Sequence, residues 1–297
     1  MTRIGFIGIG LMGHGMAKNL IAKGHGLTVM ANRSRERVDD LVARGAAEAG
    51  SPREVAAASE IVFTCVPTSD DVEGLVYGDR GILAGARDGL IHIDASTANP
   101  VSTLKIAADY QARGLRFVDA PLARTPKEAE EGRLNVIVGA SQALFDEILP
   151  VIRCFAENVF RVGEVGAGHK LKLINNFMAM SHATVVAEAV AVARATGVDV
   201  QSLHDLVSAG GANSAMVQMI MPYVLEGDGS RLQFAIGNAR KDLSYFVAMV
   251  NDARATGLVA PAVLQTLTLA AALGHGAEHV PRLTDVLTGL NGAGGRG

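Results

Sequence analysis

The sequence has few cysteines and no excess of charge of either sign. Cys65 and Cys154 are its two cysteines, and neither lies in a CxxC pair or near a cluster of histidines. This argues against a disulfide framework and a zinc site, and we expect no bound metal. The formal net charge is -3 and the sequence pI is near 6.2. Because there is neither a basic field nor an acidic tail, we expect no nucleic-acid partner and favour small molecules.

The sequence also lacks a recognisable leader and long apolar runs. The N-terminal stretch MTRIGFIGIGLMG is apolar but rich in glycine, and it has no charged leader or cleavage site, so we interpret it as folded structure. The longest apolar runs are too short to span a bilayer, and no membrane partner is expected. Together with the small number of cysteines, these features favour the reducing cytoplasm.

The pattern of apolar residues changes partway along the chain. At 297 residues two domains are expected. Up to about residue 161, short β-like runs alternate with helical stretches, which is typical of βαβ units and a parallel sheet. These runs are RIGFIG, LTVMA, EIVFTCV, GLIHIDA, LRFVDA, NVIVGA and NVFRV. We therefore predict an α/β fold with a Rossmann-like dinucleotide-binding domain at 1–163, followed by an all-α domain at 164–297.

The second domain is predicted to begin with a long helix. No Gly or Pro occurs between residues 169 and 196, and a helix of that length would run roughly 40 Å. One small domain cannot cover such a helix, so we expect it to join the domains and to pair with a partner chain as a homodimer or homotetramer. Its small and apolar residues recur on more than one side: Ala179, Ala183, Val186, Ala187 and Ala191. Further helices are predicted at 200–208, 215–225, 239–256 and 261–273.

The first chemical motif is a GxGxxG sequence that follows the first predicted strand and opens a helix at 12–23. Gly8 would make a tight turn, Gly10 would let the backbone approach a pyrophosphate, and Gly13 would let helix and strand pack closely. The N-H groups at the helix start, from Leu11 and Met12 onward, would bind the phosphates. A glycine-rich turn that binds nothing is the alternative.

The end of the second predicted strand bears on which dinucleotide is bound. Asn32-Arg33-Ser34 stands where an acid would hold a ribose 2'-hydroxyl, and no acid is there. Arg33 can pair with a 2'-phosphate, and Asn32 and Ser34 can donate hydrogen bonds to it. We therefore predict NADP, with NAD still possible. Alternatively, this segment is a solvated helix start with Ser34 as its N-cap.

Two later strand ends should line the same crevice, because ligands of open α/β sheets bind outside the carboxyl ends of the strands. Val66 and Pro67 end one predicted strand, and Thr97 follows the next and offers a hydroxyl toward a nicotinamide. Each residue alone is commonly a turn or a helix cap. Together they outline a cofactor cleft.

At the head of the long predicted helix, Lys172 precedes Asn175 by three positions and Asn176 by four, so the three share a helical face. An amine and an amide held together can protonate a carbonyl oxygen and fix its geometry while a hydride arrives from the other side. Taken alone, this pattern favours the alternative that Lys170 and Lys172 are ordinary solvated charges near a helix start.

Several separated motifs, taken together, resemble one family. In order they are GFIGIGLMGHGMAKNL, CVP, DAST, DAPL, GAGHKLKLINN and RKDL. They resemble the β-hydroxyacid dehydrogenases, which include 3-hydroxyisobutyrate dehydrogenases, tartronate semialdehyde reductases and sulfolactaldehyde reductases. The resemblance implies a helical C-terminal domain that builds oligomers. It also implies that Lys172 is the catalytic lysine, that Asn175 binds the substrate, and that Lys241 closes over the cofactor and the active site.

The chain departs from this family at residues 119–125. Most members read DAPVSGG there, and this chain reads DAPLART, so Ala123 replaces the serine and Arg124 and Thr125 replace the glycines. A GRT variant resembles the sulfolactaldehyde reductase branch, but that branch has a serine where this chain has Ala179. At a strand end, the Arg124 guanidinium could bind two oxygens of a carboxylate, sulfonate or phosphate, assisted by Thr125. Alternatively, Arg124 is a surface residue that pairs with Glu128 or Glu131.

The sequence thus predicts an oxidoreductase that interconverts a small anionic 3-hydroxy acid, or a sulfonate, and its semialdehyde with NADP(H). Lys172 would be the general acid and base. An imine reductase of the same fold is the nearest alternative, and those enzymes generally replace the lysine. A catalytically idle dinucleotide-binding protein is the other.

Overall fold

The structure, a computed structural model, describes residues 1–31 and 35–292, and its contacts divide the chain into two units. The first unit is Met1–Lys172 and the second is Leu173–Gly297. Strands and helices alternate in the first unit, and the second is helical. Helix α9 (Ala167–Thr196) begins in the first unit and continues into the second. The predicted α/β fold with a long joining helix is confirmed, and the predicted 169–196 helix lies within α9.

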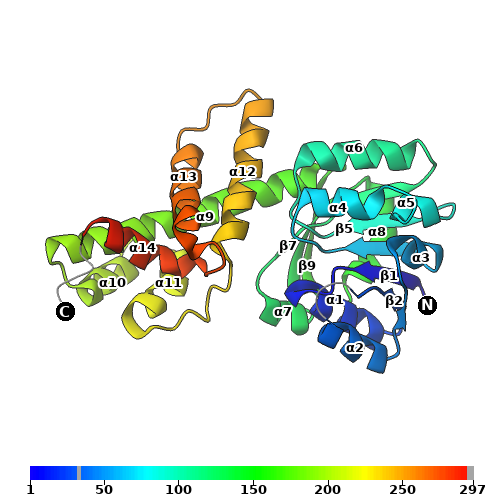
Figure 1. Ribbon diagram of the computed structural model, residues 1–297, viewed down its shortest axis with the longest axis horizontal. Helices are drawn as coiled ribbons and strands as arrows, with labels where there is room; N and C mark the ends of the chain where they lie inside the picture. Colours follow the sequence, from blue (N-terminus) through cyan, green and yellow to red (C-terminus); the bar gives the residue numbers. More distant parts are fainter. Residues whose placement is uncertain (32–34, 293–297) are drawn as a thin grey trace. The chain divides into compact units, whose positions relative to one another are not determined.

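One sheet forms the centre of the first unit (Figure 1). Its strands are β1 (Arg3–Ile7), β2 (Gly26–Val29), β3 (Ala47–Glu48), β4 (Ile61–Thr64), β5 (Ile91–Asp94), β6 (Arg116–Asp119), β7 (Leu122–Ala123), β8 (Leu134–Gly139) and β9 (Ala156–Gly163). The strand order begins β3-β2-β1-β4-β5-β6, all parallel. The chain therefore reverses its winding direction at β1, which lies between β2 and β4. Ligands of such sheets bind at that switch point.

The far end of the sheet differs from the predicted all-parallel arrangement. β8 runs antiparallel to β6 and β7, and β9 runs parallel to β8. Strands in parallel need a crossover, usually a helix that carries the chain back along the sheet. Between β6 and β8 the helix is α7 (Pro126–Glu130), which has only five residues. The chain therefore turns back on itself there.

Helices cover both faces of this sheet. The first-unit helices are α1 (Leu11–Ala22), α2 (Arg35–Ala43), α3 (Pro52–Ala57), α4 (Ser69–Val76), α5 (Ile82–Gly85), α6 (Pro100–Gln111), α7 and α8 (Gln142–Ile152). Helices α1, α2 and α8 pack on one face and α3, α4, α5 and α6 on the other (Figure 1). Side-chain caps fix several starts: Ser51 accepts from Glu54 N-H, and Asn99 accepts from Val101 N-H ahead of Pro100.

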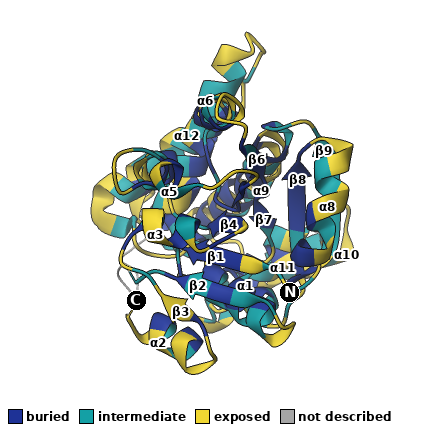
Figure 2. Cartoon of the chain, turned by 90° about the vertical axis from the view of Figure 1, so that its right-hand side faces the viewer, coloured by how far each residue is buried: buried dark blue, intermediate teal, exposed yellow. Residues whose placement is uncertain are grey.

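The core of the first unit follows from the buried strands. β4 and β5 are buried at every residue, and Figure 2 shows the inner strands mostly in dark blue. This burial explains the apolar run of β4, whereas β5 also buries the polar His92 and Asp94. Phe6 stacks on Phe63 at 5.7 Å between ring centroids, and Phe155 meets Phe63 edge-on at 5.7 Å. Each fully buried phenylalanine contributes roughly 1.5 to 3 kcal/mol, so this cluster holds the switch-point strands firmly.

The second unit packs its helices against one face of α9. They are α10 (Val200–Ala209), α11 (Ala215–Glu226), α12 (Ile236–Asp252), α13 (Ala260–Ala270), a π-helix η1 (Ala271–His275), a 3-10 helix η2 (Val280–Arg282) and α14 (Leu283–Leu290). Ala183 and Ala187 of α9 are buried in one cluster with Leu243 and Leu267. Small residues on α9 thus allow α12 and α13 to approach closely. α14 was not predicted from the sequence.

Helix α9 also passes a simple test for membrane spans. By length and composition alone it could cross a bilayer, which for a single helix is weak evidence of a span. In its most apolar stretch, 44% of the residues are buried inside the protein. A helix in a protein core passes the same test, because its neighbours cover apolar side chains as lipid would. Length and composition alone therefore do not indicate a span.

Candidate active site

The turn after β1 has the geometry that the glycine motif predicts. Gly8 has φ +101°, and a Cβ there would lie 2.2 Å from the Cys65 carbonyl oxygen. A Cβ on Gly13 would lie 2.1 Å from the Gly8 carbonyl oxygen. A Cβ on Gly10, by contrast, would meet no atom within 4 Å. Gly8 and Gly13 are thus required for the fold, whereas the space beside Gly10 is open to a ligand.

Helix α1 begins directly at that open space. Gly10 is its N-cap and makes no side-chain cap, and no acidic residue stands in its first turn. The first N-H groups of any helix lack partners within it and carry the positive end of its dipole, so the backbone at Leu11, Met12 and Gly13 suits an anion. The Leu11 side chain is exposed and that of Met12 packs on the core, which leaves the backbone as the binding element. These residues fit a dinucleotide pyrophosphate.

The loops after β4 and β5 lie at the same edge of the sheet and are joined by hydrogen bonds. The Val66 N-H donates to Ser96 Oγ at 3.0 Å, and the Ser96 N-H donates to Asp94 Oδ1 at 3.1 Å. Pro67 is exposed and Thr97 partly buried. The structure thus brings Val66, Pro67 and Thr97 to the edge that carries the glycine turn. The remaining predicted cofactor residues of this unit, Asn32, Arg33 and Ser34, lie outside the described residues.

Arg124 stands between β7 and α7 in an unusual backbone conformation. Its φ is +83°, in the left-handed region that favours glycine. Its Nη1 donates to the Arg133 carbonyl at 2.6 Å and pairs with the Glu157 carboxylate on β9. The surface partner is therefore Glu157 rather than Glu128 or Glu131. The backbone keeps the shape that a glycine would give, although the residue is an arginine.

The two neighbours of Arg124 have structural contacts. Ala123 belongs to β7 and pairs with Asn135 of β8. The Thr125 N-H and hydroxyl both donate to the Glu128 carboxylate, which forms a capping box at the start of α7. These bonds hold the pKa of Glu128 below its usual range. To contact a substrate, the Thr125 hydroxyl would have to leave Glu128.

In the second unit, predicted site residues from two helices lie together. The Asn176 amide is buried and donates to Asp242 Oδ2 at 2.6 Å. The Lys241 ammonium lies 2.9 Å from Asp242 Oδ1 and 5.4 Å from the Tyr245 ring centroid. The Asn175 amide donates to Asn176 Oδ1 at 3.3 Å. Asp242 therefore joins Asn176 and Lys241, and the sequence interpretation had assigned it no role.

Matches to family models cover both units. Residues 3–163 match the NAD binding domain of 6-phosphogluconate dehydrogenase. Residues 166–286 match the NAD-binding domain of NADP-dependent 3-hydroxyisobutyrate dehydrogenase. The chain is also 32% identical to 2-(hydroxymethyl)glutarate dehydrogenase of Eubacterium barkeri, over 99% of this chain and 98% of that one. It belongs to the β-hydroxyacid dehydrogenase family.

Two further members of this family resemble the chain over most of its length. The 3-sulfolactaldehyde reductase of Escherichia coli (strain K12) is 31% identical over 94% of this chain and 93% of that one. A structure of Mycobacterium tuberculosis 3-hydroxyisobutyrate dehydrogenase with L-serine has TM-score 0.86 and 25% identity, covering 97% of this chain and 99% of that one. The chain is accordingly an NAD(P)-dependent 3-hydroxyacid or semialdehyde dehydrogenase of the 3-hydroxyisobutyrate dehydrogenase type. Neither the imine reductase nor the idle alternative is favoured.

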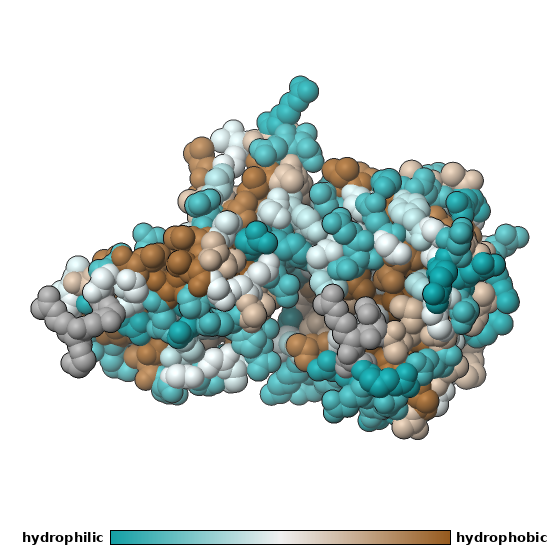
Figure 3. Space-filling model, viewed as in Figure 1, coloured by the Kyte–Doolittle hydropathy of each residue, from teal (hydrophilic) through white to brown (hydrophobic). Residues whose placement is uncertain are grey.

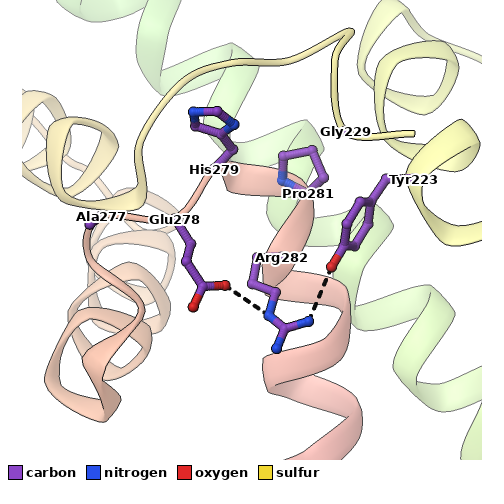
Figure 4. A pocket seen from close by; sticks show the side chains of 7 residues that line it. All are labelled: Tyr223, Gly229, Ala277, Glu278, His279, Pro281 and Arg282. Carbon is purple, nitrogen blue, oxygen red and sulfur yellow. Dashed lines mark hydrogen bonds and ion pairs between the residues drawn. The ribbon is translucent and has the colours of Figure 1, made fainter. Parts of the chain in front are cut away.

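The helical unit of this protein also contains a cavity, and none of the predicted site residues lines it. It measures about 290 Å³ and is lined mainly by Tyr223, Glu278, His279 and Arg282 (Figure 4). Arg282 lies 2.8 Å from Glu278, 3.2 Å from the Tyr223 hydroxyl and 2.8 Å from Asp285. Because Glu278 and Asp285 already pair with the Arg282 guanidinium, this cavity is poorly suited to bind an anionic substrate.

The sequence interpretation missed three buried polar residues near the predicted site: Asp94, Asp119 and His169. Both aspartates end apolar strands, β5 and β6, and His169 stands in the first turn of α9. An acid at the end of a strand could have indicated the two aspartates, since an ionised carboxylate is rarely buried without partners. His169 carried no such signal in the sequence.

Proposed function

We propose that the chain reduces a small anionic semialdehyde, or oxidises the matching 3-hydroxy compound, with Lys172 as general acid and base. The open backbone at Gly10, at the switch point of the sheet, carries this proposal because it is where a dinucleotide can approach. The bound nicotinamide would supply or accept the hydride. In reduction, the Lys172 ammonium gives its proton to the carbonyl oxygen as an alkoxide develops there. In oxidation, the neutral amine takes that proton back.

Asn175 would hold the reacting oxygen one helical turn beyond Lys172. Both residues lie on α9, and their spacing of three positions puts them on one face of this helix. The Asn175 amide can donate to the carbonyl oxygen of the substrate while Lys172 protonates the same oxygen. The two contacts fix the orientation of the reacting carbon. Asn176 and Lys241, which Asp242 joins, would support this face and close over the cofactor.

Arg124 would hold the acid group of the substrate, with Thr125 beside it. A guanidinium offers five donors in a fork, so Nη1 can stay on Glu157 while other donors turn to a carboxylate, sulfonate or phosphate. The left-handed backbone at Arg124 supports a substrate role, since such strain persists where the surrounding structure demands it and clusters at ligand sites. The competing carboxylate of Glu157 would weaken that hold.

For the cofactor we propose a preference for NADP. No acid follows β2 to repel a 2'-phosphate, and Arg33 stands there. Arg35 is a weaker candidate because it already pairs with Glu48 and Asp39, which raise its pKa. Residues 166–286 match a domain of an enzyme described as NADP-dependent, which is compatible with this choice.

We also propose that residues 1–163 bind the cofactor and 164–297 bind the substrate and a second copy, in the cytoplasm. One face of α9 carries exposed Met178, Val185 and Val192, seven positions apart and 55%, 64% and 49% exposed. Figure 3 shows hydrophobic side chains gathered on the surface of this unit. An apolar stripe of this length favours burial against the same helix of a second subunit.

A substrate screen tests the proposal. Purified protein would be assayed with C3 and C4 semialdehydes bearing carboxylate, sulfonate or phosphate, each with NADPH and with NADH. We expect turnover of at least one anionic semialdehyde, faster with NADPH. If NADPH binds but no semialdehyde of the panel is turned over, while a cyclic imine assayed alongside is reduced or is also untouched, the proposal is contradicted.

A further inference from the structure

The carboxylate of Asp119, at the end of β6, holds the first turn of α9. Its Oδ1 accepts the Gly166 N-H at 2.7 Å, and its Oδ2 accepts the His169 N-H at 2.7 Å. The side chain is fully buried. The N-H groups at a helix start have no partner within the helix and carry its positive dipole end, so they compensate the buried charge. Hydrogen bonds of this charge-assisted kind are short and strong.

Two glycines make the space that this carboxylate occupies. A Cβ on Gly139 would lie 2.3 Å from Asp119 Oδ1, and one on Gly168 would lie 2.9 Å from Oδ2. A Cβ on Gly168 would also lie 2.6 Å from the Ile137 carbonyl oxygen. The start of α9 therefore approaches β6 and β8 as closely as backbone can, and it has little freedom to shift.

The His169 side chain ties the same helical turn to two further elements. It is fully buried, and its Nε2 lies 3.1 Å from the Ser96 carbonyl oxygen, which can only accept, so Nε2 carries a proton. Its Nδ1 lies 2.7 Å from the Thr103 hydroxyl of α6. The carboxylates of Asp94 and Asp119 flank the ring at 3.8 and 4.0 Å.

The hydrogen bonds continue from His169 to the proposed cofactor loops. Asp94 Oδ1 accepts both the Thr64 hydroxyl at 2.9 Å and the Ser96 N-H at 3.1 Å. Ser96 Oγ in turn accepts the Val66 N-H. A continuous set of buried contacts thus runs from the loops after β4 and β5 to the first turn of α9. Lys172 stands three residues after His169, on the next turn of that helix.

We propose that Asp119 and His169 are positioning residues that set where Lys172 stands relative to the loops at 66–67 and 96–97. This rests on the proposed catalytic role of Lys172. A shift of about 1 Å between reacting groups can lower a rate roughly 100-fold. Fixing the start of α9 on two strand ends and on α6 would therefore keep Lys172 where the reaction needs it. Neither residue needs to touch the substrate.

The test compares kcat, KM and cofactor affinity in three variants, assayed with the best semialdehyde of the panel and NADPH. His169→Ala removes the ring contacts, and Asp119→Asn places an amide against a backbone N-H that needs an acceptor. We expect kcat to fall by about 10- to 100-fold in both, with KM and the NADPH Kd within about twofold of the parent values. His169→Gln keeps an amide that can donate to the Ser96 carbonyl oxygen and stay in contact with the Thr103 hydroxyl, and it should recover most of the rate.

Ser59→Ala is the matched control. Ser59 is also buried, but its hydroxyl donates to the Val55 carbonyl oxygen of α3 at 2.6 Å and has no part in the contacts that run from Thr64 and Asp94 to α9. This variant should lose stability at most and keep kcat. In protein without cofactor, amide exchange at 166–170 should speed up in His169→Ala and Asp119→Asn and stay unchanged in Ser59→Ala.

The outcomes separate this inference from the proposed function. If the His169 and Asp119 variants have a lower melting temperature but normal kcat and normal amide exchange at 166–170, both residues are merely structural and the inference is overturned. If Lys172→Ala is inactive while the His169 and Asp119 variants are fully active, the inference alone fails. If Lys172→Ala keeps its turnover, the proposed function fails first.

Discussion

Arg124 and Glu157 form an ion pair that joins the segment after β7 to β9, although Arg124 stands at φ +83°. This left-handed conformation destabilises the fold by roughly 1 to 2 kcal/mol for a residue other than glycine. An exposed ion pair stabilises it by at most about 1 kcal/mol. The pair alone is therefore a weak reason for an arginine at a position shaped for glycine. A contact with an anionic substrate is a stronger one.

Replacing this arginine tests that contact. Arg124→Gly relieves the backbone, so the fold should keep its stability, whereas KM for an anionic semialdehyde should rise by the equivalent of about 1.5 to 3 kcal/mol. A neutral aldehyde of similar size should be affected much less, and Arg124→Lys should recover only part of the loss. Glu157→Gln removes the competing carboxylate and should lower KM for the anion. If KM for charged and neutral substrates changes equally in Arg124→Gly, Arg124 does not bind the acid group and only pairs with Glu157.

The glycines after β1 should separate folding from binding. Gly13→Ala forces a Cβ against the Gly8 carbonyl and should destabilise the protein by about 1 to 3 kcal/mol in thermal unfolding without cofactor. Gly10→Ala meets no atom of the protein and should lose at most about 1 kcal/mol, as an N-cap change. It should nevertheless weaken NADPH binding by about tenfold or more in a fluorescence titration, because its methyl group occupies the space for the pyrophosphate. Unchanged NADPH affinity in Gly10→Ala would place the phosphates elsewhere.

Cofactor choice should depend on Arg33. Arg33→Asp puts a like charge beside a 2'-phosphate and should weaken NADPH binding far more than NADH binding. Arg35→Asp is the control of equal charge change, because Arg35 is engaged by Asp39 and Glu48, and it should affect both cofactors little and alike. Equal losses of NADPH and NADH affinity in Arg33→Asp would remove the assignment of NADP.

The apolar stripe on α9 should mediate oligomerisation. Val185→Glu places a charge in the middle of the stripe and should shift sedimentation toward the monomer mass at micromolar protein. Val101→Glu, at a similarly exposed valine of α6 in the other unit, should leave the mass unchanged. A parent protein that sediments as a monomer with full activity would contradict the proposal.

The fold was largely predictable because its signals are local. The seven β-like runs correspond to the strands β1, β2, β4, β5, β6, β8 and β9. Strand direction is not local: the reversal at β8 follows from a five-residue helix that a sequence pattern does not measure. The short α14, with eight residues after a proline-containing 3-10 turn, also gave too weak a pattern.

The site residues were predictable only where their spacing along the sequence indicates their chemical role. The glycine motif and the Lys172–Asn175 spacing are visible along the chain. The pairing of Arg124 with Glu157, 33 residues away, and of Asp119 with His169, 50 residues away, arises from sheet topology and has no sequence period. These partners become visible only when β6, β9 and the start of α9 are in place.

The most direct test of the account is single-turnover reduction of the best anionic semialdehyde by Lys172→Ala, with NADPH binding measured alongside. We expect the rate to fall by about 10²- to 10⁴-fold, the usual contribution of general acid-base catalysis, with the NADPH Kd nearly unchanged. A Lys172→Ala protein that binds NADPH normally and reduces the semialdehyde at nearly the parent rate would contradict it.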